Sequence, residues 1–369
     1  MSEVYAARRD RLRERCHAGG SAAALVTGNA NVRYLAGTAP AGAALLVCPG
    51  RDVLLCPRDD PSGDTAGPRA AEDLQVVVVP EAEGDPAVAG AERAAAAGAG
   101  SLAVEEHHLT VSRHRALQSA APRLRLTDLG TAVEQQRLVK DAEEISSLRI
   151  AAEIADQALG ELLESILVGR TERHLALELE RRLVDHGATG PAFPTSVGTG
   201  PNSGLAGHLP GDRRVEEGDF LSVCVGADYG GYRSEIGRTF VIGTSPADWQ
   251  IELYDQVFAA QRAGREALAP GTPYREVDRA ARVVLEAAGH GERVGPRIGH
   301  GVGLENDEDP RLTPSAMGKL DACVPVTVDP GVHLPGRGGV RIDDTLVVRP
   351  EADGGPELLT ITTKELLAL

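Results

Sequence analysis

The stretch LSVCVGADYGGYRSEIGRTF, residues 221–240, has the pattern of a β-hairpin. Apolar residues alternate along its first half, the pair Gly230-Gly231 supplies a tight turn, and alternation resumes after it. With a two-residue turn, Gly226 faces Glu235, and Cys224 shares a face with Gly226 because side chains alternate along a strand. Cys224 and Glu235 are then diagonal neighbours, about 7–8 Å apart at the backbone, and within reach of one shared ion.

The order of elements around this hairpin occurs twice in the chain. A helix pair, a glycine-rich passage and paired strands are followed by a second set of the same kind. The first helix begins at an Asp141-x-x-Glu144 capping pattern, and its apolar residues recur at helical spacing. We therefore expect two related halves whose sheets meet around a shared site. In each half the ranges give the two helices, the glycine-rich passage and the paired strands in turn: 141–166, 171–187, 190–204 and 221–240 in the first, then 246–268, 274–289, 293–310 and 323–348 in the second.

The residues before about 130 alternate short apolar strands with helical stretches, which indicates a small α/β domain. It carries no glycine-rich phosphate loop after a strand, and the adjacent His107 and His108 are interpreted as solvated loop residues. We expect an N-terminal domain of residues 1–134 and a second domain of residues 135–369. The predicted strands are 22–26, 42–48, 52–56, 74–80, 101–106 and 124–128, and the predicted helices are the N-terminus, 85–98 and 110–121.

Composition and charge exclude several classes of protein. Lys and Arg number 38 against 54 Asp and Glu, a formal charge of −16, which repels nucleic acid and anionic lipid. No apolar run approaches the roughly 20 residues of a membrane span, and the first residues lack the apolar core of a signal peptide. The five cysteines are odd in number and widely spaced, so we interpret them as reduced thiols of a cytoplasmic protein.

Donor residues recur in the second half of the repeat. His300 lies in GHGVG, Asp329 precedes Pro-Gly, and Asp343 lies in VRIDD. With Cys224 and Glu235 they supply one thiol, one imidazole and three carboxylates, which is a plausible metal constellation. Structural interpretations stay open beside this one: Cys224 as a buried core thiol, Asp329 as the start of a turn, Glu235 paired with Arg341 or Arg238, and Asp343 paired with Arg341.

Six motifs resemble one protein family. They occur at 32–37, 138–159, 193–203, 231–243, 299–308 and 330–344 as VRYLAG, LVKDAEEISSLRIAAEIADQAL, FPTSVGTGPNS, GYRSEIGRTFVIG, GHGVGLENDE and PGVHLPGRGGVRIDD. The chain resembles the pita-bread metallopeptidase family of Xaa-Pro aminopeptidases, prolidases, creatinases and methionine aminopeptidases over nearly its whole length. The resemblance implies a creatinase-like N-terminal α/β domain, a pseudo-symmetric pita-bread (α+β) C-terminal domain, and a homodimer.

The resemblance also implies a metal site, with substitutions in this chain. The family holds two divalent metals with Asp, Asp, His, Glu and Glu, the first two of them eleven residues apart. Cys224 and Glu235 keep that spacing and fill the aspartate positions, His300 is unchanged, and Asp329 and Asp343 fill the glutamate positions. A thiolate favours Zn or Fe over Mn, so we expect those metals, with one ion, two ions or none bound.

Further family positions imply catalytic and substrate-binding residues. His208 fills the position of a proton-shuttling or substrate-binding histidine, and Asp329 would hold and deprotonate the attacking water. Asp307, Glu308 and Arg341 are assigned to substrate binding, and Asp307 replaces the family's second active-site histidine. A carboxylate there opposes the developing negative charge, so we expect reduced or absent Xaa-Pro turnover.

Three functions follow from these observations. The favoured one is a metal-dependent hydrolase of short Xaa-Pro peptides with an altered centre, in which the metal activates the attacking water. The second is a metal-free, creatinase-like hydrolase of a small C–N substrate, and the third is a non-catalytic peptide-binding protein. Metal analysis separates the first from the others, and turnover separates the second from the third.

Overall fold

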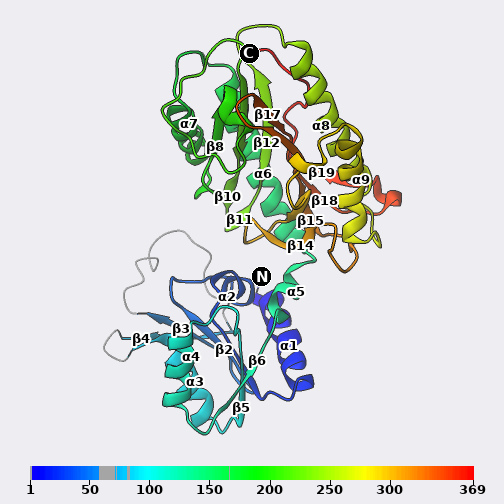
Figure 1. Ribbon diagram of the computed structural model, residues 1–369. Helices are drawn as coiled ribbons and strands as arrows, with labels where there is room; N and C mark the ends of the chain where they lie inside the picture. The colour runs from blue at the N-terminus through cyan, green and yellow to red at the C-terminus, as the bar shows by residue number, and fades with distance from the viewer. Residues whose placement is uncertain (1, 58–70, 72, 81–83, 166) are drawn as a thin grey trace. The chain divides into compact units, whose positions relative to one another are not determined.

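In the computed structural model, described residues are 2–57, 71, 73–80, 84–165 and 167–369 (Figure 1). They group into two compact units, Met1–Arg137 and Leu138–Leu369. The predicted domain boundary between residues 134 and 135 stays a prediction, because compactness alone does not show that either unit folds independently. Among the described helices, none combines the length and the apolar character that crossing a bilayer requires.

The N-terminal unit is a six-stranded mixed sheet in the order β4-β3-β2-β1-β5-β6, and its strands lie where the sequence predicts them. Figure 1 shows α3 and α4 on one face of this sheet and α1 on the other. The strands are β1 (Ala23–Val26), β2 (Ala44–Val47), β3 (Val53–Pro57), β4 (Gln75–Val79), β5 (Ser101–Val104) and β6 (Arg125–Asp128). The helices are α1 (Ser2–Ala18), α2 (Asn29–Ala36), α3 (Pro86–Ala96), α4 (Val111–Ala120) and α5 (Ala132–Arg137).

Two of these helices, α2 and α5, were not predicted. Helix α2 has 8 residues, and it ends at Gly37, whose φ of 81° is the left-handed conformation that glycine adopts readily at helix ends. Helix α5 has 6 residues. Segments this short span about two turns or fewer, so apolar periodicity cannot reveal them.

The C-terminal unit contains the repeat of two halves that the sequence predicts. Its helices are α6 (Ala142–Leu163), α7 (Glu172–Asp185), α8 (Asp248–Glu266) and α9 (Tyr274–Ala287). The strands of the first half are β7 (Gly190–Pro191), β8 (Ser196–Thr199), β9 (Phe220–Val225), β10 (Ala227–Tyr229), β11 (Tyr232–Arg233) and β12 (Ile236–Val241). Those of the second are β13 (Gly299–Gly301), β14 (Glu308–Leu312), β15 (Pro325–Val328), β16 (Gly331–Leu334), β17 (Gly338–Arg341), β18 (Asp344–Val347) and β19 (Glu357–Leu358).

Each half has its own apolar core under its own helix pair. Helices α6 and α7 pack on strands of the first half, and α8 and α9 pack on strands of the second. The predicted cap of α6 is present: Asp141 accepts from the backbone N–H of Glu144, and the Glu144 side chain accepts from the N–H of Asp141. The cores and caps therefore confirm the repeated helix–helix–strand order.

The central hairpin has the register that its sequence predicts. Gly230 and Gly231 take φ values of 59° and 84°, as a type I′ turn requires. Tyr229 pairs with Tyr232, and the pairing continues in the same register along β9 and β12. The alternation and the glycine turn thus set the strand register that places Cys224 near Glu235.

The two halves meet at Gly237 and Asp343. The N–H of each donates to the carbonyl of the other, at 3.1 and 3.0 Å. A Cβ on Gly237 would lie 2.2 Å from Asp343 Oδ2, so only glycine fits at this contact. This contact places Asp343, which belongs to the second half, against the first hairpin.

Candidate metal centre

Cys224 and Glu235 lie side by side on the first hairpin. Both are buried, and Cys224 Sγ donates to Glu235 Oε1 at 3.4 Å. Thr345 of β18 fixes the backbone of Glu235: its Oγ1 accepts from the Glu235 N–H at 3.1 Å and donates to the Glu235 carbonyl at 2.8 Å. The second half therefore holds the acid of the first half in place.

His300 of β13 points its Nε2 atom at two acids. This atom lies 3.2 Å from Glu235 Oε2 and 3.9 Å from Asp329 Oδ2. The other ring nitrogen, Nδ1, lies 3.0 Å from the carbonyl of Gly301. Such a backbone contact fixes the ring orientation, as is usual for metal-ligating histidines.

The five residues predicted as ligands come together as two overlapping groups. Cys224, Glu235 and Asp343 form the first, which we call the sulfur side; Glu235, His300 and Asp329 form the second, the histidine side. Within each group, one donor atom from each residue lies within 4.8 Å of the others. Glu235 belongs to both, so it stands where a ligand shared by two ions would stand.

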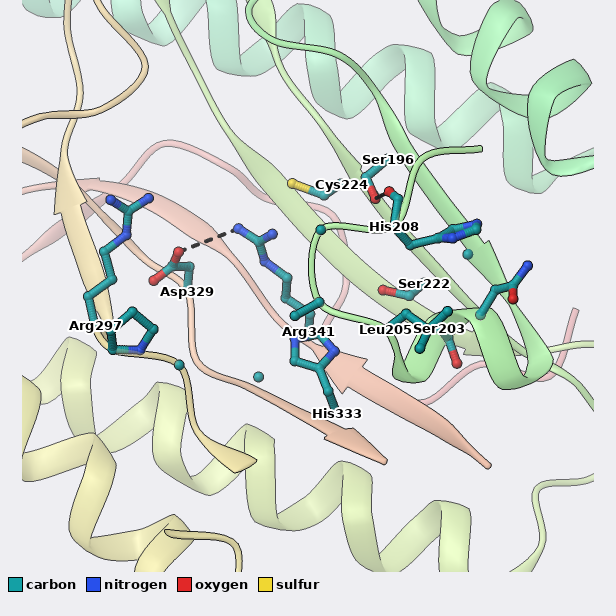
Figure 2. A pocket seen from close by; sticks show the side chains of 17 residues that line it. Ser196, Ser203, Leu205, His208, Ser222, Cys224, Arg297, Asp329, His333 and Arg341 are labelled. Carbon is teal, nitrogen blue, oxygen red and sulfur yellow. Dashed lines mark hydrogen bonds and ion pairs between the residues drawn. The ribbon is translucent and has the colours of Figure 1, made fainter. Parts of the chain in front are cut away.

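Arg341 of β17 places its guanidinium among the acids. It contacts Glu235 Oε1 at 2.7 Å, Asp343 Oδ2 at 2.7 Å and Asp329 Oδ2 at 3.4 Å. Figure 2 shows the pair of Arg341 and Asp329 at the pocket. The structure therefore shows both arrangements: the acids pair with Arg341, and they also lie close enough together to act as metal ligands.

The central acid and the imidazole hold each other in the charged form. Burial disfavours the charge on Glu235, but the hydrogen bond with His300 and the charge of Arg341 outweigh it and lower the pKa of Glu235 to about 2. Burial likewise opposes the charge on His300, but Glu235 and Asp329 outweigh it and raise the pKa of His300 to about 9. In the metal-free protein this pair is thus ionic at neutral pH.

Asp343, Asp329 and Cys224 keep their protons more readily than Glu235 does. Burial raises the pKa of Asp343 to about 7 and that of Asp329 to about 6, against the opposing charge of Arg341. Burial also raises the pKa of the Cys224 thiol well above its ordinary value. A metal at this site would therefore displace protons from the imidazole and the thiol.

The donor set fits a divalent ion. It offers sulfur, imidazole nitrogen and carboxylate oxygen, the three donor types that bind Zn and Fe. Asp329 Oδ1 and Asp343 Oδ2 are buried and have no hydrogen-bond partner among the described residues, although Asp343 Oδ2 lies 2.7 Å from Arg341 Nε. The Cys224 thiol and the His300 ring both contact Glu235. A bound ion would take the place of the protons in these two contacts.

A pocket of about 370 Å³ opens beside the centre (Figure 2). Cys224, Asp329 and Arg341 line it together with His208, the predicted catalytic histidine. His208 Nε2 lies 2.8 Å from Glu172 Oε2, so a fully buried acid orients this ring. The remaining lining includes Ser196, Ser222, Arg297 and His333.

Asp307 and Glu308, predicted to bind substrate, are not among the residues that line this pocket. Asp307 pairs with Arg297, which does line it. Glu308 is buried and pairs with Lys140, Nζ to Oε2, at 3.0 Å. Their substrate-binding roles stay predictions, as do the roles assigned to the other site residues.

Three residues were missed from the sequence: Ser222 and Arg297, which line the pocket, and Glu172, which contacts the lining residue His208. Ser222 lies two residues from Cys224 on the same strand face, so alternation could have found it. Arg297 lies in an irregular glycine-rich passage with no periodic signal. Glu172 opens a helix, where an acid is expected to be solvated, yet it is fully buried and accepts four hydrogen bonds, from Thr199, Asn202, His208 and Gly211.

Known proteins resemble this chain along nearly its whole length. Residues 146–350 match the family model of metallopeptidase family M24, and residues 8–139 match the creatinase/prolidase N-terminal domain. An Xaa-Pro dipeptidase of Pyrococcus furiosus is 38% identical over 235 residues, 64% of this chain. That match covers 66% of the relative, just under two thirds of its length.

Two further comparisons extend over almost all of the chain. The uncharacterized peptidase YqhT of Bacillus subtilis is 33% identical over 354 residues, 94% of this chain and 95% of its own. The solved structure of an Xaa-Pro dipeptidase from Bacillus anthracis matches with a TM-score of 0.89 and 31% identity over 99% of this chain and 100% of that one. The predicted fold, an N-terminal α/β domain followed by a pseudo-symmetric pita-bread domain, is confirmed. This chain belongs to metallopeptidase family M24.

Proposed function

We propose that this protein is a metal-dependent hydrolase that cleaves short Xaa-Pro peptides. The observation that carries the proposal is the convergence of Cys224, Glu235, His300, Asp329 and Asp343 beside one pocket. The pocket, about 370 Å³, has the size of a small-molecule site. The Xaa-Pro dipeptidases among the relatives support the substrate class.

Membership of a metallopeptidase family implies use of a divalent metal. We propose one or two ions, held by the histidine side and the sulfur side with Glu235 shared. Zn or Fe is favoured over Mn, because the Cys224 sulfur is softer than the carboxylates around it. A bound ion supplies Lewis-acid polarisation of the scissile carbonyl and lowers the pKa of a water.

We propose that Asp329 holds the attacking water and takes its proton. It lines the pocket, and its Oδ1 atom has no hydrogen-bond partner among the described residues. His208 lines the same pocket, and Glu172 fixes its ring. We propose that His208 returns a proton to the leaving amine or binds the substrate.

Two arginines of the pocket could contact the carboxylate of a dipeptide, although each also pairs with acids of the protein. Arg297 and Arg341 both line the pocket, and charge-assisted contacts to a carboxylate are strong. Asp307 pairs with Arg297, so we propose that it positions this arginine. We propose that the carboxylate of the C-terminal proline of such a dipeptide contacts these arginines.

Two further properties belong to the proposal. The five cysteines are free, which suits a reducing compartment such as the cytoplasm. A homodimer is the assembly that the family resemblance implies.

The test is metal analysis of protein purified without added metal, joined to an assay on Ala-Pro and Met-Pro with Ala-Gly as control. We expect Zn or Fe in the protein, and slow cleavage of the proline peptides that a chelator abolishes. Zn or Fe(II) should restore activity better than Mn. Cleavage without metal would indicate the metal-free hydrolase, and binding without cleavage would indicate the peptide-binding protein.

A further inference from the structure

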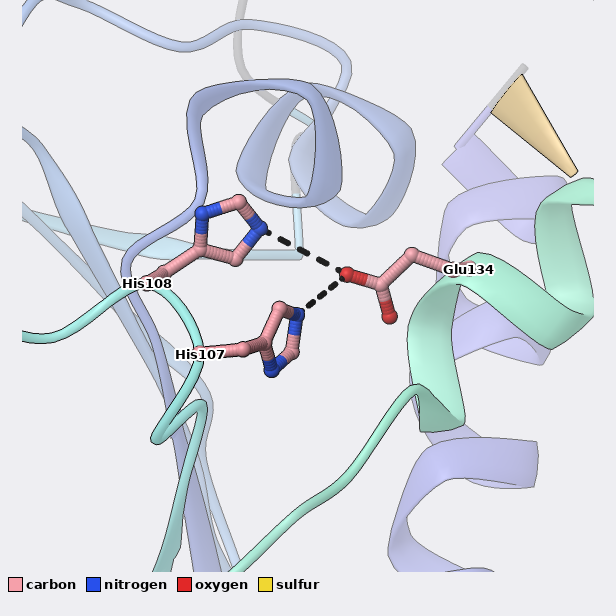
Figure 3. Close-up of side chains that lie close together, drawn as sticks. All are labelled: His107, His108 and Glu134. Carbon is pink, nitrogen blue, oxygen red and sulfur yellow. Dashed lines mark hydrogen bonds and ion pairs between the residues drawn. The ribbon is translucent and has the colours of Figure 1, made fainter. Parts of the chain in front are cut away.

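The N-terminal unit contains a second cluster of metal-ligating side chains, formed by His107, His108 and Glu134 (Figure 3). His107 Nε2 lies 2.9 Å and His108 Nε2 lies 3.6 Å from Glu134 Oε1. One donor atom from each residue lies within 4.8 Å of the others. The two histidines, interpreted from the sequence as solvated loop residues, therefore share one carboxylate.

The surrounding residues hold this carboxylate in place. Asn31 Nδ2 donates to Glu134 Oε1 at 2.7 Å, and Arg137 Nη1 donates to Asn31 Oδ1 at 2.7 Å. Glu134 Oε2 is buried and has no hydrogen-bond partner in the described part of the chain. One carboxylate oxygen is thus anchored, and the other is withdrawn from water without a donor.

The backbone leaves room for the second histidine. A Cβ on Gly28 would lie 3.0 Å from His108 Nε2, so this ring packs over a glycine. Both imidazoles are 38% exposed, so an aqueous ion can reach them. The Glu134 side chain is less exposed, at 21%, and its Oε2 atom is buried.

The spacing of the donors matches a small transition-metal ion. Zn–N and Zn–O bonds of about 2.0–2.1 Å in a tetrahedron place donors about 3.3 Å apart. The two imidazole-to-carboxylate distances, 2.9 and 3.6 Å, lie on either side of this value. Two imidazoles and one carboxylate form a ligand set that Zn commonly accepts, with water in the open position.

We propose that His107, His108 and Glu134 bind one divalent transition-metal ion of the Zn²⁺ class, separate from the proposed catalytic centre. The ion replaces the two protons that the imidazoles direct at Glu134 and takes the negative charge of the carboxylate. It ties the turn after β5 to helix α5, 27 residues further along the chain. Its effect is to stabilise the native N-terminal unit, because it binds the folded chain and not the unfolded one.

The test is a Zn²⁺ titration of the full-length chain by calorimetry, with elemental analysis after dialysis. We expect the His107→Gln, His108→Gln double variant to bind one Zn²⁺ fewer than the wild type, with peptide cleavage unchanged. The matched control is His17→Gln, which changes an exposed histidine of α1 and should bind as the wild type does. Equal Zn²⁺ numbers in the wild type and the double variant overturn the proposal.

Two further variants keep the result interpretable. Glu134→Gln preserves the shape of the side chain and should also lose one Zn²⁺, so the proposal is tested even where the double variant does not fold. His300→Gln alters only the catalytic centre and should leave the N-terminal ion bound. Loss of Zn²⁺ in His300→Gln alone would assign all binding to the catalytic centre and contradict the second site.

Discussion

The sulfur side and the histidine side of the proposed centre share Glu235 but are neutralised differently. On the sulfur side, Arg341 contacts both oxygens of Asp343, at 2.8 and 2.7 Å. On the histidine side, Arg341 reaches Asp329 only at 3.4 Å, and Asp329 Oδ1 stays without a hydrogen-bond partner among the described residues. Both sides keep one carboxylate oxygen without a hydrogen-bond partner among the described residues, Asp343 Oδ2 and Asp329 Oδ1. Arg341 nevertheless lies 2.7 Å from Asp343 Oδ2, whereas it approaches Asp329 only through Oδ2, so its positive charge compensates the sulfur side more than the histidine side. We infer that the histidine side takes the first ion.

The largest expected effect comes from restoring the family residues on both sides at once. The set is Cys224→Asp, Glu235→Asp, Asp307→His, Asp329→Glu and Asp343→Glu. One donor to a developing oxyanion is typically worth 10²–10³ in rate, so kcat/KM for Ala-Pro should rise by at least about that factor with Mn or Zn. The Asp307→His single variant is the control, because it measures the rate gain from the one residue of the set that is not a predicted metal ligand.

The restoration has two informative failures. If the restored variant folds and binds metal but cleaves Ala-Pro no faster, the proposal of an Xaa-Pro hydrolase with an altered metal centre is contradicted. Native turnover at rates ordinary for an enzyme, about 1–10³ per second, would show that the altered ligands are already a working design.

Single substitutions separate the two sides. His300→Gln removes the imidazole of the histidine side, and Cys224→Ser removes the thiol of the sulfur side. Loss of groups outside the first coordination shell costs about 10–100-fold in affinity, so loss of a direct ligand should cost about 100-fold or more. Competition titrations with Zn²⁺ should show the larger loss in His300→Gln; a larger loss in Cys224→Ser would reverse the order of the two sides.

The pH dependence of metal binding sharpens the same comparison. His300 must lose its proton to bind an ion, and its pKa is raised to about 9, so affinity should rise with pH between about 6 and 9. The expected slope is about tenfold per pH unit for each proton released. Calorimetry in two buffers of different ionisation enthalpy counts these protons, and Cys224→Ser should release one fewer. Equal proton counts would mean that Cys224 does not bind as a thiolate.

The smallest effect is expected next to the centre, at Glu172. Its carboxylate accepts from His208 and from the loop around it, and Glu172→Gln turns an N–H group toward these donors. We expect a loss of about 1–3 kcal/mol in unfolding free energy at pH 7 and weaker dipeptide binding. Glu153→Gln, an exposed change on α6, should stay within about 0.5 kcal/mol of the wild type.

The pH profile of this variant has a definite sign. Hydrogen bonds outweigh burial and lower the pKa of Glu172 below its ordinary 4.5, so its stabilisation is present above that pH and is lost as pH falls. The difference in unfolding free energy between wild type and Glu172→Gln should therefore shrink below about pH 4.5. A difference that stays constant under acid would show that the charge on Glu172 does not matter.

Local patterns predicted much of this structure. The Gly230-Gly231 turn gave the register that puts Cys224 next to Glu235, and the Asp141 cap gave the start of α6. Both depend on residues close together in sequence, where alternation, glycine conformation and capping act directly. The family motifs then placed the second-half donors near the hairpin.

Contacts between distant segments could not be predicted in the same way. Arg341 meets Glu235 across 106 positions, and Lys140 meets Glu308 across 168. Helix α2 is too short for a periodic signal, although its Asn31 donates a hydrogen bond to Glu134 of the proposed second metal site. The sequence left the pairing of Glu235 and Asp343 with Arg341 open as one alternative, and the structure shows that both acids contact this arginine.

The most direct test of the proposed centre is the absorption spectrum of the Co²⁺-substituted protein. If Cys224 and His300 are ligands of one centre, the wild type should show a thiolate-to-cobalt charge-transfer band in the near ultraviolet. Cys224→Ser should lose this band while still binding Co²⁺ through the histidine side, and His300→Gln should bind it far more weakly. Identical spectra for wild type and Cys224→Ser would contradict a metal centre that contains Cys224.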